Sequence, residues 1–237
     1  MIEEVIKEIK SLYNEKYAQH HTRFFKTGKG EYGEGDKFLG LMVPQTKSIS
    51  KKYFKHISLE DTSELIKNEY HEIRLAALHI LVLKYKKADE KLKKKIYELY
   101  LKNTKYINNW DLVDLSAPYI VGDYVYANKL HNDLWKLAKS NHLWSERIAV
   151  VANAYLIRQG DFETILNLAE YFLPHKHDLM HKAVGWMLRE TGKKDIAVLS
   201  EFLDKNAQYM PRTMLRYAIE RYPEDERQAY LKIKKIN

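Results

Sequence analysis

One acidic residue interrupts a recurring row of cationic residues in this chain. Four segments begin with Lys or Arg and carry a small or β-branched residue two positions later; they begin at Arg74, Arg147, Lys182 and Arg216. The segment in the gap between the first two begins with Asp114. A row of cations suits a phosphate backbone, so a carboxylate within it repels the ligand that its neighbours attract. Asp114 is therefore expected either to pair with Arg147 or Arg74, or to carry out chemistry on a bound ligand.

Two tryptophans share the helix faces of these polar residues. Trp110 lies four residues before the acid, and Trp186 lies four residues after Lys182, so each ring is one helical turn from its polar partner. In a cationic groove, an indole offers a flat surface for a base or a sugar. Helically spaced aromatic residues also pack in protein cores, which is the alternative for both rings and the expectation for Trp135 and Trp144.

Amphipathic helices must hold these residues, because apolar residues recur at helical spacing nearly from end to end. Only nine Gly and five Pro are spread over 237 residues, too few for the many turns of a sandwich or barrel. The leading residues recur at intervals of 33 to 40, and each interval holds one further amphipathic helix. The sequence therefore predicts an all-α fold, a curved α-solenoid of HEAT-like helix-pair repeats with the leading residues along one face.

The predicted solenoid is a single domain over residues 1–237. N-terminal capping helices occupy 1–58 and include a glycine-rich loop at 28–40, interpreted either as a flexible connector or as a segment that closes over a ligand. Helix-pair repeats follow over 59–222, and residues 223–237 form a C-terminal tail. Individual helices are expected at 3–19, 44–56, 60–67, 71–86, 90–103, 110–118, 128–140, 143–158, 161–172, 178–191, 195–204 and 211–222.

Composition narrows the class of protein. The net charge of +8 favours a polyanionic partner, although a merely lysine-rich soluble protein would have the same balance. Without Cys, a disulfide framework or thiolate metal site is excluded, and the ten His form no HExxH motif, so no metal and no other cofactor is expected. No segment has the pattern of a signal peptide or a membrane helix, which predicts a cytoplasmic protein without a membrane partner.

Three motifs occur in order along the chain: NNWDLVD (108–114), HLWSERIAV (142–150) and KAVGWMLRE (182–190). With these motifs the chain resembles the HEAT-like repeat alkylpurine DNA glycosylases, the DNA alkylation repair enzyme family. The likeness extends from about Phe24 to Tyr222. Some members have a second Trp directly before the catalytic one, where this chain has Asn109, so the resemblance leaves the substrate range open.

The resemblance implies a monofunctional N-glycosylase that acts on duplex DNA containing alkylated bases and hydrolyses the bond between sugar and N3- or N7-alkylated purine. Carried over position by position, Asp114, Trp110 and Trp186 match the family's catalytic residues, and Arg147 matches an arginine near the lesion backbone. A monomer is expected. The further residues expected to bind DNA are Lys182, Arg74, Arg212 and Arg216.

The implied mechanism needs a carboxylate rather than a proton donor. An alkylated purine cation departs as a neutral base, whereas the sugar becomes oxocarbenium-like as the bond breaks. Asp114 would stabilise that positive charge and position the attacking water. Two other functions stay open: a non-catalytic HEAT-repeat protein that binds damaged or branched DNA, and a protein-binding scaffold.

Overall fold

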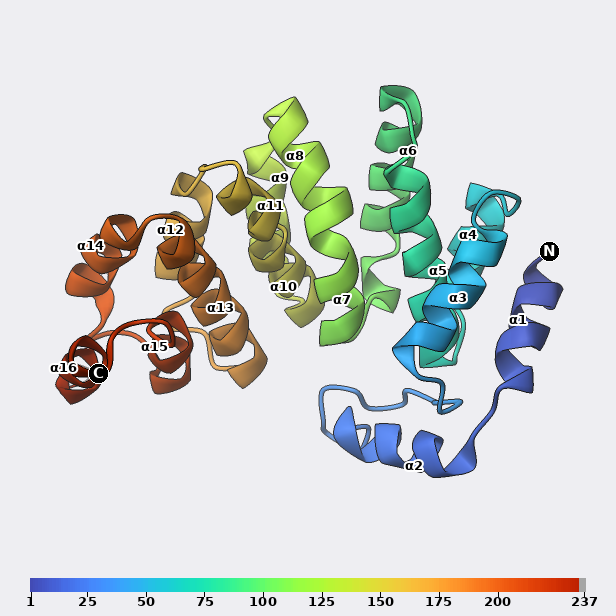
Figure 1. Cartoon of the computed structure of the whole chain (residues 1–237), viewed down its shortest axis with the longest axis horizontal. Coiled ribbons are helices and arrows are strands. Elements are labelled where there is room, and N and C mark those ends of the chain that lie inside the picture. Colours follow the sequence, from blue (N-terminus) through green and yellow to red (C-terminus); the bar gives the residue numbers. More distant parts are fainter. Residues whose placement is uncertain (235–237) are drawn as a thin grey trace. The chain divides into compact units, whose positions relative to one another are not determined.

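The computed structural model describes residues 1–234, and within that range the chain is helical apart from turns, loops and one isolated bridge between Lys37 and Tyr70. The prediction of an all-α fold is confirmed. The chain divides into two compact units, Met1–Ile120 and Val121–Asn237, a division that the periodicity did not indicate (Figure 1). None of the helices in the described range has the length and apolarity needed to cross a membrane.

Unit 1 is built around α5 (His71–Tyr85), which packs mainly against α3, α4 and α7 and also contacts α1 and α6. The remaining elements of this unit are α1 (Ile2–Ser11), α2 (Glu15–Phe24), α3 (Val43–Tyr53), α4 (Leu59–Ile66), α6 (Glu90–Lys102), the 3-10 turn η1 (Thr104–Tyr106) and α7 (Trp110–Ala117). In Figure 1, α2 lies crosswise to α1 and α3. The single helix predicted over 3–19 is wrong, because the Asn14 side chain accepts the Tyr17 N–H at 3.1 Å and caps a second helix there.

Unit 2 begins within η2 (Pro118–Gly122), a π-helical turn that follows α7 directly. Its helices are α8 (Asp123–Asn128), α9 (His131–Ala138), α10 (Leu143–Val151), α11 (Asn153–Arg158), α12 (Glu163–Tyr171), α13 (Asp178–Lys194), α14 (Ile196–Asn206), α15 (Arg212–Ala218) and α16 (Glu224–Lys232). Helix α8 was not predicted, and most of the predicted C-terminal tail is α16. The last part of that tail, 235–237, lies outside the described residues.

Within each unit, the helices that carry the leading residues of the repeat pack on one another in chain order. Helix α5 packs on α7 in unit 1, while α10 packs on α13 and α13 on α15 in unit 2. This neighbour order is the one that stacked helix pairs produce. The approach of α13 to α15 is close, because a Cβ on Gly185 would lie 2.4 Å from the Met214 carbonyl oxygen. Glycine is therefore the residue that this crossing accommodates.

Candidate functional site

The start of α7 positions the two candidate residues of unit 1. The Asn109 side chain accepts the Trp110 N–H at 2.8 Å, and the Asp111 carboxylate accepts the Leu112 N–H at 2.9 Å, so the first turn is held by its own side chains. Leu112 is fully buried, whereas Trp110 and Asp114 are half-buried. The spacing of four residues thus places the indole and the carboxylate on the less buried face of one helix, a turn apart.

Aromatic side chains from the end of α2 support Trp110. Its ring is stacked on Phe25, with centroids 5.4 Å apart and planes at 26°, and it meets Phe24 edge-on at 6.0 Å. Phe25 is buried and Phe24 is 55% exposed. Neither phenylalanine was predicted to belong to the site; the adjacent pair in RFFK was the only local signal.

Asp114 lies close to a buried tyrosine. The Tyr100 hydroxyl is completely buried and 2.9 Å from Ser116 Oγ. Burial raises the pKa of Tyr100 above its ordinary value, and the negative charge of Asp114 raises it further, against the opposing hydrogen bond from Ser116. Tyr100 therefore stays neutral and cannot act as a base.

Arg74 is placed differently from the expectation of a phosphate contact. Its guanidinium is buried, with Nη2 2.7 Å from Asp36 Oδ1 and Nη1 donating to the Asn68 and Glu69 carbonyl oxygens at 2.9 and 3.2 Å. A charge that is already paired and removed from solvent does not contribute to a surface track of cations. The row of leading residues therefore begins with an internal ion pair.

In unit 2, the long helix α13 carries Lys182 and Trp186 one turn apart. Lys182 Nζ lies 2.8 Å from Asp178 Oδ2, an exposed pair within the helix. The Trp186 indole is half-buried and its N–H donates to Glu190 Oε1 at 3.2 Å. Arg147 is buried, and its Nη1 donates to the Leu179 carbonyl oxygen at 2.7 Å. This bond ties α10 to the first turn of α13.

The last two predicted cations differ from each other. Arg212 Nη2 donates to the Ile233 carbonyl oxygen at 2.7 Å, so it anchors the segment that follows α16. Arg216, four residues further along α15, is exposed. Among the other tryptophans, Trp144 is buried as predicted, whereas Trp135 is half-buried and meets Tyr171 edge-on with centroids 5.7 Å apart.

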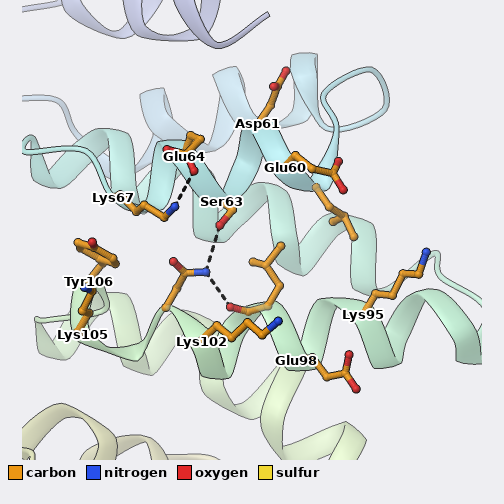
Figure 2. Close-up of a pocket in the computed structure, with 13 residues that line it drawn as sticks. Glu60, Asp61, Ser63, Glu64, Lys67, Lys95, Glu98, Lys102, Lys105 and Tyr106 are labelled. Carbon is orange, nitrogen blue, oxygen red and sulfur yellow. Dashed lines mark hydrogen bonds and ion pairs between the residues drawn. The ribbon is translucent and has the colours of Figure 1, made fainter.

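An open pocket of about 750 Å³ in unit 1 lies along α4, α6 and η1 (Figure 2). None of the predicted site residues lines it. Its charged side chains are of both signs and equal in number: Glu60, Asp61, Glu64, Glu98, Lys67, Lys95, Lys102 and Lys105. Because the carboxylates and lysines balance, the charge of this pocket does not favour a polyanion.

The family of this chain is shown by its match to a sequence model. The sequence model of a family described as DNA alkylation repair enzyme matches residues 5–222. No curated protein matches the chain. Among solved structures, a protein described as a predicted DNA alkylation repair enzyme from Enterococcus faecalis is similar with a TM-score of 0.69 and 15% identity, covering 90% of this chain and 97% of that chain. At that identity the likeness shows a shared fold.

Proposed function

Because the chain belongs to the DNA alkylation repair enzyme family, we propose that it is a monofunctional N-glycosylase that releases N3- and N7-alkylated purines from duplex DNA. The observation that carries this proposal is the half-buried face at the start of α7, where Trp110 and Asp114 lie one turn apart. An indole beside a carboxylate, in a chain with a net charge of +8, suits a reaction that builds positive charge on a sugar.

The alkylated base supplies its own leaving-group ability, because it departs as a neutral purine. The barrier that remains is the oxocarbenium-like sugar, and an ionised Asp114 lowers it by electrostatic attraction. The same carboxylate orients the water that attacks the anomeric carbon. The face of Trp110 holds the deoxyribose and favours its positive charge. The motif KAVGWMLRE implies a catalytic role for Trp186 as well. No lysine nucleophile takes part, so the strand stays intact.

The exposure and the partners of the cationic side chains change the set of residues that we propose as phosphate contacts. Lys182 and Arg216 have exposed side chains and are the phosphate contacts of the proposal. Arg147 is buried and its Nη1 donates to the Leu179 carbonyl oxygen, so it is left out of the phosphate contacts. Arg74 and Arg212 have structural partners within their own units and are left out.

Release of free base from methylated duplex DNA tests the proposal. Asp114→Asn keeps the shape and removes the charge, so the single-turnover rate of 7-methylguanine or 3-methyladenine release should fall about 10²–10³-fold. Asp225→Asn, which removes the same charge from the exposed first turn of α16, is the matched control and should leave the rate unchanged.

Three other results would each contradict a part of the proposal. Normal release by Asp114→Asn removes Asp114 from the mechanism. Salt-dependent DNA binding by the wild-type chain without base release indicates the non-catalytic DNA-binding protein, and the absence of such binding indicates the scaffold. For the phosphate contacts, Lys182→Ala and Arg216→Ala should each flatten the slope of log K against log salt by about 1.

A further inference from the structure

The glycine-rich segment 25–42, which runs from α2 to α3 in Figure 1, is an ordered part of unit 1. Two of its carboxylates fold it locally: Glu31 accepts the Gly28 N–H at 2.9 Å and Glu34 accepts the Gly30 N–H at 2.8 Å. Its far end is held by the buried Glu72 of α5, whose carboxylate accepts three successive backbone N–H groups, those of residues 39, 40 and 41, at 2.7 to 3.2 Å. The segment is therefore fixed in place and is not a loose connector.

Asp36 is the point at which this segment meets two other elements. Its side chain is only 5% exposed and forms the ion pair with Arg74 of α5. It also accepts hydrogen bonds from the side-chain amides of Asn108, at 3.0 Å, and Asn109, at 3.5 Å, which directly precede Trp110. One buried carboxylate thus joins the segment, α5 and the start of α7.

His71, at the first position of α5, extends this contact to α7 itself. Its Nε2 lies 2.8 Å from Asp111 Oδ2 and its Nδ1 lies 3.5 Å from Asp36 Oδ2. Burial opposes a charge on His71, but the carboxylates of Asp111 and Asp36 override that effect and raise its pKa to about 9. His71 is therefore an imidazolium between two carboxylates, and with Arg74 the buried cluster contains two charges of each sign.

The same imidazole belongs to the aromatic cluster beneath Trp110. Its ring centroid is 5.0 Å from that of Phe25 and 4.8 Å from that of Phe38, and Phe25 is stacked on Trp110. Trp110 is therefore held in two ways. Its backbone follows two asparagines bonded to Asp36, and its ring rests on a phenylalanine that contacts His71.

We propose that Asp36 and His71 are positioning residues for catalysis, which act through Phe25 and the 108–111 turn to hold the indole of Trp110 where the sugar of the damaged nucleotide binds. The effect on catalysis rests on the proposed function. In this proposal the glycine-rich segment belongs to the site through its buried Asp36, and its lysines take no part. Lys37, the lysine next to Asp36, pairs with Glu69 at the surface.

A positioning role differs from a purely structural one in what it changes. Loss of stability alone lowers the fraction of folded chain, and the folded molecules keep their rate. A shift of the Trp110 indole by about 1 Å lowers the rate of the chemical step itself, by up to about 100-fold. Single-turnover release, measured with enzyme in excess at a temperature where the variant is folded by circular dichroism, separates the two.

The test variant is Asp36→Asn, which keeps the shape of the side chain and removes its charge. Its matched control is Glu34→Gln, which removes a charge from the exposed part of the same segment and keeps a side-chain oxygen that can accept the Gly30 N–H. We expect Asp36→Asn to lower the single-turnover rate at least about tenfold while the dissociation constant for DNA changes less than about twofold. Glu34→Gln should match the wild-type chain in both.

A second readout does not depend on base release. The emission of Trp110 is obtained by subtracting the fluorescence of the same chain carrying Trp110→Phe. Quenching of this emission by acrylamide reports how firmly the ring is held on Phe25. We expect Asp36→Asn to raise the quenching constant of Trp110 and Glu34→Gln to leave it unchanged. If the wild-type chain releases no base, the proposed function fails, and this measurement still decides whether the cluster positions the ring.

The inference is overturned if Asp36→Asn is folded and both its rate and its Trp110 quenching equal those of the wild-type chain. Should that variant not fold, Asn108→Ala replaces it, since it deletes one donor to Asp36 and leaves the ion pair with Arg74 intact. The same change in rate and quenching is then expected, smaller in size. An unchanged Trp110 in that variant overturns the inference equally.

Discussion

Substitution of one glycine in α13 should damage unit 2 far more than substitution of another in the same helix. In Gly185→Ala, the new Cβ would lie 2.4 Å from the Met214 carbonyl oxygen and 2.6 Å from Tyr217 Cβ, both on α15. In Gly192→Ala, the nearest atom is the terminal Cδ2 of Leu199, also at 2.4 Å. A side-chain methyl can rotate away, whereas a helix carbonyl moves only with its helix.

The size of the effect follows from these distances. An ordinary Cβ contact begins at 3.4 Å, so the Gly185→Ala contact at 2.4 Å requires α13 and α15 to separate by about 1 Å. Overpacking of this kind costs about 1–3 kcal/mol. Both alanines gain about 1 kcal/mol in helix propensity, and this gain cancels when the variants are compared. Gly185→Ala should therefore be less stable than Gly192→Ala by about 2 kcal/mol, or about 4–8 °C in Tm.

Urea denaturation followed by circular dichroism measures this difference directly. Because Trp186 follows Gly185 in the chain, the single-turnover rate of base release should fall in Gly185→Ala and stay normal in Gly192→Ala. Equal stability of the two variants would refute the argument that backbone contact between α13 and α15 requires glycine.

Three further predictions concern His71, Phe25 and Arg212. The pKa of His71 is raised from 6.5 to about 9, so its charge stabilises the fold fully below pH 6.5, and this contribution is lost as the pH rises through 9. The difference in unfolding free energy between the wild-type chain and His71→Gln should therefore shrink over that range. A difference that does not change with pH would contradict the charged state of His71. Phe25→Ala should cost about 3–5 kcal/mol in urea denaturation, and a cost below about 1 kcal/mol would show that Phe25 does not support Trp110. Arg212→Ala should speed proteolysis between α15 and α16 and leave the affinity for DNA unchanged, since Arg212 donates to the Ile233 carbonyl oxygen. Weaker DNA binding with an unchanged rate of proteolysis would restore Arg212 as a DNA contact.

Most of the helices, and the placement of Trp110 and Asp114 one turn apart, could be predicted because both depend on spacing within one helix. The break between α1 and α2 was missed for the same reason. Apolar residues keep helical spacing across the break between α1 and α2. The capping role of Asn14 is recognised only in the structure, where the chain turns between the two helices. Local periodicity finds helices well and is less sensitive to their interruption.

The role of Arg74 could not be predicted, because burial depends on what the rest of the chain places opposite a residue. In the sequence, Arg74 and Arg216 occupy equivalent positions of the repeat. In the structure, Arg74 is buried against Asp36, which lies 38 residues earlier, whereas Arg216 is exposed. Nothing in the glycine-rich segment marks Asp36 among its neighbouring acids Glu31 and Glu34 as the one that becomes buried.

The contacts of Asp36 also have a consequence for the order in which the molecule folds. Stacked helix pairs join residues close in sequence, and such contacts form early and quickly. The bonds from Asp36 to Arg74 and Asn108 instead close loops of 38 and 72 residues, which carries an entropic cost before any contact compensates it. The support for Trp110 should therefore be completed late, after the helices have formed. A newly made chain would form its helices first. Its site would become competent only once the glycine-rich segment has docked on α5 and the start of α7.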